Sequence, residues 1–92
     1  MIGVTPKHTF TYDGATSNVY HANKGEGILK HTHVYSHATI CHNGSIIIRK
    51  EGKEVTANKH SGAFNLIGTE WHEIEALEDD TVFVNVFSEG KY

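Results

Sequence analysis

The apolar residues of this chain occur in short runs bounded by turn-forming residues, and this pattern most constrains its fold. The runs are rich in β-branched and aromatic residues, as in SIIIRK (45–50), AFNLI (63–67) and TVFVNVF (81–87). Apolar residues seldom recur at the three- and four-residue spacing of an amphipathic helix. About seven to nine short strands separated by turns therefore predict an all-β sandwich or barrel.

Two β-hairpins are expected from the turn residues. Residues 45–57 hold two runs around the sequence EG, whose glycine suits the positive φ of a tight turn. The segments TFTYDG (9–14) and SNVYHA (17–22) indicate a second hairpin, with DGAT between them.

Alternation indicates which side chains face inward in the last two runs. In WHEIEAL (71–77), Glu73 and Glu75 are expected to face solvent, which sends His72 to the inner face. The run TVFVNVF at 81–87 leaves two alternatives open, because either its aromatic residues with Asn85 or its three valines can face the core.

Length and charge narrow the class of protein. The 92 residues predict one domain spanning 1–92. The formal net charge is −3 with no basic patch, so nucleic-acid binding is not expected. No apolar stretch resembles a signal peptide or a membrane span. Cys41 is the single cysteine and cannot form an internal disulfide, so we expect a soluble cytoplasmic protein.

Histidine is the residue type that stands out. There are eight histidines, as many as lysines and arginines together, and three of them lie within HTHVYSH (31–37). On an extended strand His31 and His33 point the same way, and His37 can join them after a short turn. His72 lies on a separate expected strand. Four neutral imidazoles can then converge on one transition-metal ion, the alternative being a hydrogen-bonded or solvent-exposed cluster.

The spacing around these histidines resembles the first motif of the cupin family. Residues 25–44 read Gly25-x5-His31-x-His33-x3-His37-x6-Gly44, with His37 where that motif usually has glutamate. The second cupin motif is matched only in part at 62–76. There the glycine and His72 are one residue closer than in the motif, the proline is missing, and Ala76 stands at the asparagine position.

The resemblance implies a single-domain jelly-roll β-barrel, the cupin-like double-stranded β-helix. It also implies that His31, His33, His37 and His72 bind one divalent transition metal per chain, which can be Mn, Fe, Cu, Ni or Zn. With a tetrahedral ion the four histidines would fill the coordination shell, and the site would be structural. With an octahedral ion two coordination positions would stay open for water or substrate.

Four further residues are candidates for the wall of a pocket beside the metal. Tyr35 lies between the histidines and can cover the mouth of the pocket. Cys41 has the same strand parity as His37 and either lines the pocket or fills the core. Asn85 and Phe87 belong to the last expected strand, which lines the cavity in related barrels.

The remaining histidines are expected on the surface: His8, His21, His42 and His60.

Two functions from different classes follow. The first is a metal-dependent enzyme, with oxygenase chemistry first and isomerase or lyase chemistry second, acting on a small oxygenated molecule that chelates the ion. The second is a non-enzymatic module in which the metal binds a ligand or stabilises a small barrel. We also expect a homodimer, because a second subunit can cover exposed edge strands.

Overall fold

The computed structural model describes residues 1–88, which form β-strands joined by turns and loops. The strands are β1 (Ile2–Gly3), β2 (His8–Tyr12), β3 (Ala15–Ala22), β4 (Glu26–His31), β5 (His37–Asn43), β6 (Ser45–Lys50), β7 (Lys53–Asn58), β8 (Ala63–Leu66), β9 (His72–Ala76) and β10 (Thr81–Ser88). No helix of the described residues is long and apolar enough to cross a membrane.

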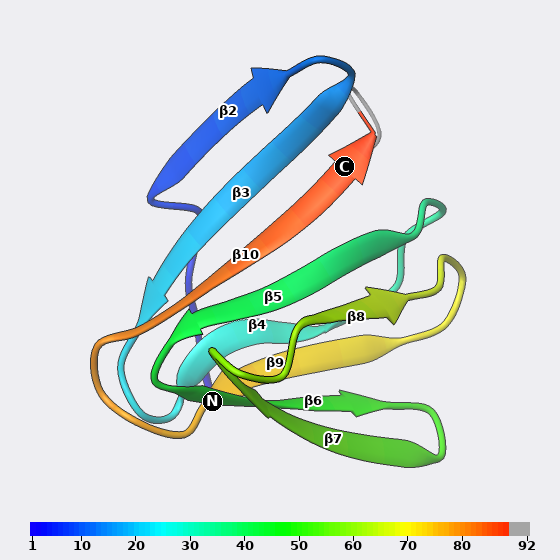
Figure 1. Ribbon diagram of the computed structural model, residues 1–92. Helices are drawn as coiled ribbons and strands as arrows, with labels where there is room; N and C mark the ends of the chain where they lie inside the picture. Colours follow the sequence, from blue (N-terminus) through cyan, green and yellow to red (C-terminus); the bar gives the residue numbers. More distant parts are fainter. Residues whose placement is uncertain (89–92) are drawn as a thin grey trace.

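The strands form two five-stranded sheets that pack face to face (Figure 1). One sheet, called sheet A, has the order β1-β4-β9-β6-β7, and the other, called sheet B, has the order β2-β3-β10-β5-β8. The β1–β4 pair is parallel and the other described pairs are antiparallel. The all-β prediction is therefore confirmed.

The core lies between the sheets and consists of every second residue of the central strands. Ile46, Ile48 and Ile74 of sheet A are almost fully buried, as is Phe83 of sheet B. Phe83 stacks on Tyr20 with 4.9 Å between ring centroids, an arrangement that adds to the stability from burial alone. Burying each large aliphatic side chain stabilises the fold by about 2 kcal/mol, so this layer is the main source of stability.

The structure decides the open question about residues 81–87. Phe83, Asn85 and Phe87 of β10 are buried between the sheets, while the valines between them are partly exposed on the outer face. This orientation follows from strand pairing. β10 pairs with both β3 and β5, so its inward and outward side chains must alternate in step with theirs.

Both expected hairpins are present. β6 pairs with β7 around residues 51–52, and β2 pairs with β3 around Asp13 and Gly14. Asp13 and Gly14 both have positive φ, 48° and 82°, as a two-residue turn of the type that suits twisted strands requires. Glu73 and Glu75 point away from the core, as predicted, and form ion pairs with Arg49.

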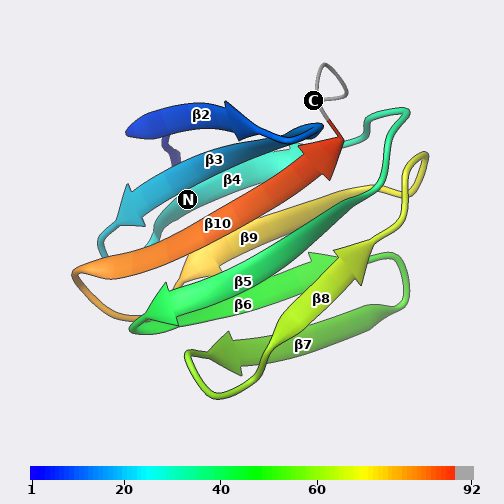
Figure 2. The ribbon, with the colours of Figure 1, turned by 45° about the horizontal axis from the view of Figure 1, so that its top comes forward.

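The sheets keep open edges. β2 is exposed along its whole length, and its Phe10 and Tyr12 are among the exposed large apolar residues. On the opposite side, β7 and β8 are the edges of sheet A and sheet B (Figure 2). The expected homodimer and the cytoplasmic location stay predictions.

The two glycines that bound the first motif both occupy left-handed backbone conformations, and they differ in their surroundings. Gly25 has a φ of 87° with open space around it. Gly44 has a φ of 73°, and a Cβ there would lie 3.0 Å from the backbone Cα of Thr81 and nearer still to its hydroxyl.

We predict that Gly44→Ala destabilises the protein more than Gly25→Ala. Left-handed strain costs about 1–2 kcal/mol at either position. Steric overlap with Thr81 adds roughly 1–3 kcal/mol at position 44 alone. Urea unfolding followed by tryptophan fluorescence measures both variants, and equal losses of stability would contradict the packing of Gly44 against Thr81.

Candidate metal centre

The four histidines of the sequence prediction lie at one end of the sandwich. His31 is the last residue of β4, His72 the first of β9 and His37 the first of β5, while His33 lies in the loop between β4 and β5. His31 and His72 are paired on neighbouring strands of sheet A. His37 approaches from sheet B, so the cluster joins the two sheets.

The ring nitrogens converge on one point. His72 Nε2 lies 3.3 Å from His33 Nε2 and 3.3 Å from His37 Nε2. Candidate ligand nitrogens of His31, His33 and His72 all lie within 4.8 Å of one another. The four rings are packed edge to face or tilted, with centroids between 4.5 and 5.2 Å apart.

Hydrogen bonds to the other ring nitrogens determine which nitrogen carries the proton. His31 Nδ1 lies 2.9 Å from the Leu29 carbonyl, which only accepts, so Nδ1–H donates and Nε2 keeps its lone pair. His37 Nδ1 lies 3.2 Å from the Thr39 hydroxyl oxygen. That hydroxyl donates its proton to Asn85 Oδ1 at 2.7 Å, and it therefore accepts from His37 Nδ1–H.

These tautomers leave Nε2 of His31 and of His37 with a free lone pair, as a metal ligand requires. The separation of 3.3 Å between His37 Nε2 and His72 Nε2 also matches the spacing of two ligands on one ion. Two nitrogens bound to one ion at about 2.1 Å are about 3.0 Å apart in octahedral and about 3.4 Å apart in tetrahedral coordination. The donor set consists of neutral imidazoles, which suit Mn, Fe, Cu, Ni and Zn.

Burial keeps the central histidines uncharged. His37 and His72 are 4% and 1% exposed. Burial, together with the neighbouring His72 and His33, lowers the pKa of His37 from 6.5 to about 3. Burial lowers the pKa of His72 to about 4, with further contributions from His31, His33 and Lys50. Neutral imidazole is the form that binds a metal, so these pKa values favour binding at neutral pH.

His33 is held less firmly than His37. Burial lowers its pKa, and the backbone of Tyr35 acts against this effect. Its Nδ1 is buried without a well-aligned hydrogen bond, so the loop carries one buried polar atom that the protein does not fully satisfy.

A chain of buried polar groups runs from the histidines into sheet B. Thr39 and Asn85 are 0% and 3% exposed, and they lie side by side on β5 and β10. Asn85 and Asn18 both hydrogen-bond to the Tyr20 hydroxyl, whose pKa is raised by burial. Such a connected chain holds the His37 ring in one orientation. Period-two alternation from His37 already placed Thr39 inward, but its partner Asn85 is distant in sequence.

The predicted pocket residues divide between the site and the core. Phe87 is buried, and its ring lies 4.6 Å from that of His37 and 5.9 Å from that of His33. Asn85 is buried and accepts a hydrogen bond from Thr39, and its role in lining the pocket stays a prediction. The Tyr35 side chain is 45% exposed, in the loop beside His33, and its role as a cover stays a prediction.

Cys41 belongs to the apolar core. It shares the inner face with His37 but lies four residues farther along β5, a distance of roughly 13 Å. Its thiol faces the carbonyl groups of Asn43 and Gly44, and the side chain packs in the apolar core. The structure therefore supports the alternative in which Cys41 fills the core.

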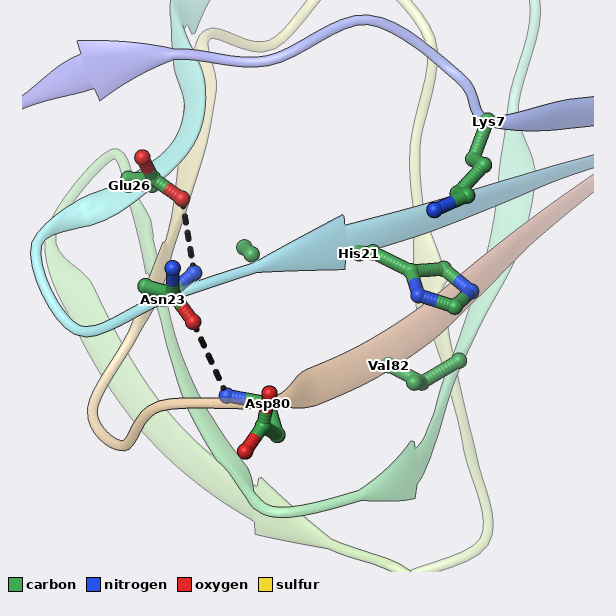
Figure 3. Close-up of a pocket in the computed structure, with 7 residues that line it drawn as sticks. Lys7, His21, Asn23, Glu26, Asp80 and Val82 are labelled. Atoms are coloured by element: carbon green, nitrogen blue, oxygen red, sulfur yellow. Dashed lines mark hydrogen bonds between the residues drawn. The ribbon is translucent and has the colours of Figure 1, made fainter.

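The opposite end of the sandwich holds a cavity of about 410 Å³ beside Lys7 and His21, and none of the four clustered histidines lines it. Figure 3 shows Asn23 between Glu26 and Asp80. The backbone N–H of Asn23 donates to Glu26 Oε1 at 2.7 Å, and the backbone N–H of Asp80 donates to Asn23 Oδ1 at 3.1 Å. These groups are used to hold the turns together. His8, His42 and His60 are exposed, as is His21, which agrees with the sequence prediction.

Comparison with solved structures identifies the architecture. KdgF from a Halomonas species superposes with a TM-score of 0.78 at 18% identity, over 88% of this chain and 76% of that one. A cupin-2 domain protein from Shewanella frigidimarina gives 0.73 at 9% identity, over 94% and 84%. The chain has the cupin fold.

Further cupins agree with this assignment. A cupin 2 domain-containing protein from Halorhodospira halophila superposes with a TM-score of 0.80 at 11% identity, over 92% of this chain and 64% of that one. No protein-family model matches the sequence, and no curated protein matches it. The likeness is one of fold, and the chemistry must be argued from the residues of this chain.

We predict that the metal-free protein loses stability as the pH falls from about 6.5 towards about 4. In that window the unfolded chain binds protons that buried His37 and His72, with pKa values of about 3 and 4, do not bind. Stability therefore rises with pH and levels off above the ordinary histidine pKa. Urea unfolding of chelator-treated protein at pH 5 and pH 7 measures the slope. His37→Asn flattens it and a variant of exposed His60 does not, whereas a flat wild-type profile would rule out the buried neutral rings.

We also predict that Thr39→Val weakens metal binding by about 10- to 100-fold, the usual cost of losing the group that orients a histidine ligand. Valine keeps the shape of threonine but cannot accept the His37 Nδ1 proton. Thr39→Ser restores the hydroxyl and is expected to retain most of the affinity. Competition with a chromophoric zinc chelator gives the three dissociation constants, and equal values for threonine and valine would exclude a positioning role for Thr39.

Proposed function

We propose that this cupin binds one divalent transition metal through His31, His33, His37 and His72 and acts as a metal-dependent enzyme. Oxygenase-type chemistry on a small oxygenated substrate that chelates the metal is the first choice, and isomerase or lyase chemistry is the second. The proposal rests above all on His72 Nε2, which lies 3.3 Å from the Nε2 atoms of both His33 and His37, the spacing expected of nitrogens that share one ion.

The surroundings of the cluster favour binding of a small molecule. A depression of about 330 Å³ lies on the outer side of His33, lined also by Thr32, Val34 and Thr69. A second cavity, of about 370 Å³, lies on the side of the open sheet edges and includes Leu66, the strand neighbour of His37. Cavities of this size are typical of sites for small organic molecules.

The residues of this chain have definable roles in such a site. When bound, the metal would polarise a substrate oxygen or activate dioxygen, which is the chemistry that the side chains alone lack. The hydrogen bonds from His31 and His37 to Leu29 and Thr39 hold the ligand nitrogens in place. Phe87 covers the rings of His33 and His37 from sheet B and keeps bulk water from that side.

A non-enzymatic function is the second candidate, and one observation favours it. Phe87 is buried against two of the histidine rings, so part of the space around a bound ion is already filled by protein. A metal that joins sheet A to sheet B would then act mainly as a structural link in a small domain.

We predict that purified protein contains about one Mn, Fe, Cu, Ni or Zn per chain and that His33→Ala or His72→Ala removes it, because either change deletes a converging nitrogen. Elemental analysis and EPR of protein prepared without chelator measure the metal, with His60→Ala as the matched control because His60 is exposed in the β7–β8 turn.

The same samples separate the two candidate functions. Dioxygen uptake with small chelating acids, lost in His33→Ala and kept in His60→Ala, supports the enzyme. A melting temperature that falls sharply on metal removal, with no turnover, supports the structural link. Metal retained by both site variants would refute the four-histidine centre.

A further inference from the structure

Two lysines lie on the inner-facing side of sheet A at the end of the β6–β7 hairpin, where Lys50 is half-buried and Lys53 is exposed. Along β6 the inward positions are Ile46, Ile48 and Lys50, and along β7 they begin with Lys53. Lys50 and Lys53 are directly opposite each other in the strand pairing, so their side chains leave the sheet on the same face. Like charges in directly opposed positions destabilise a sheet.

Arg49, the neighbouring cation on the outer face of sheet A, differs from these lysines because it has carboxylate partners. Arg49 forms ion pairs with Glu54, Glu73 and Glu75, at distances of 3.2, 3.4 and 2.9 Å. Within residues 1–88 neither Lys50 nor Lys53 forms an ion pair. The outward Arg49 is thus neutralised, whereas the half-buried Lys50 and the exposed Lys53 form no ion pair among the described residues.

Both lysines line a cavity of about 370 Å³, called here the lysine cavity, whose lining comes from β6 and the edge strands β7 and β8. Its walls are otherwise mainly apolar. Ile48 and Val55 come from sheet A, and Phe64 and Leu66 come from sheet B. A cavity with apolar walls and two ammonium groups at one end fits a molecule with an apolar body and an acidic group.

The lysine cavity is adjacent to the histidine cluster. Lys50 is the strand partner of His72 in sheet A, and Leu66 is the strand partner of His37 in sheet B. The backbones of Lys50 and His72 are therefore one strand spacing, about 5 Å, apart, and their side chains leave the sheet on the same face.

We propose that the lysine cavity binds the carboxylate of a small organic acid through Lys50 and Lys53, with the apolar body against Phe64 and Leu66. The ammonium groups donate charge-assisted hydrogen bonds to the carboxylate, which removes their mutual repulsion. The further step, in which the other end of the acid reaches the metal, rests on the proposed function. Four neutral imidazoles leave the charge of the ion uncompensated, so an anionic ligand complements both sites.

The test compares 3-phenylpropionate with its neutral amide, 3-phenylpropionamide, by isothermal titration calorimetry. Wild-type protein is used both zinc-loaded and chelator-treated. Lys50→Gln and Lys53→Gln remove one charge each from the lysine cavity, and Lys59→Gln removes one from an exposed turn as the matched control.

The carboxylate is expected to bind at least about tenfold more tightly than the amide, a preference lost in the Lys50 and Lys53 variants and kept in Lys59→Gln. Without ligand, Lys53→Gln is expected to raise the melting temperature, because it relieves repulsion, so unfolding cannot explain lost binding. Equal binding of acid and amide would overturn the proposal, and so would tighter binding of inorganic phosphate than of the carboxylate.

The two protein forms distinguish this proposal from the metal proposal. A preference for the acid that persists in chelator-treated protein supports the lysine cavity whether or not the histidines bind metal. Zinc binding without any preference for the acid overturns the lysine cavity and leaves the histidine centre intact.

Discussion

His37 and His72 belong to different sheets, and their Nε2 atoms are 3.3 Å apart because the two sheets share one apolar core. Ile48 and Ile74 from sheet A and Phe83 from sheet B set the spacing of that core. The histidines continue the inward-facing rows of their strands where those rows reach the end of the sandwich. The geometry of the cluster therefore depends on the same packing that stabilises the fold.

Placing neutral imidazoles in this position has a physical cost that the protein offsets locally. Buried polar atoms need partners, and His37 finds one in Thr39, which is itself bonded to Asn85. The resulting chain reaches Tyr20 and ends deep in sheet B. Because the Thr39 hydroxyl donates to Asn85 and so accepts from His37, the chain also selects the tautomer of His37. The hydrogen bond that satisfies the buried Nδ1 of His37 thus also leaves its Nε2 available to bind a metal ion.

The charges around the site are distributed unevenly between the two faces of sheet A. On the outer face three carboxylates surround Arg49. On the inner face Lys50 lies beside His72 and opposite Lys53. Cupins share an architecture that supports many chemistries, so such local differences, rather than the barrel, carry the information about ligands.

Short-range patterns in the sequence determined much of this protein. Period-two alternation and turn residues predicted the β6–β7 and β2–β3 hairpins, the outward glutamates of β9 and the inward direction of His72. The spacing of His31, His33 and His37 singled out the cluster. These features depend on neighbours a few residues apart, which a single sequence displays directly.

Only the tertiary structure decided which residues from distant strands meet. It placed Cys41 in the core, joined Thr39 to Asn85, buried Phe87 against the histidines and set Lys50 beside His72. Alternation gives the face on which a side chain lies, but strand order and register determine its neighbours on that face. Register is decided by the pairing of whole strands around a shared core, and so by interactions between segments that are far apart in the chain.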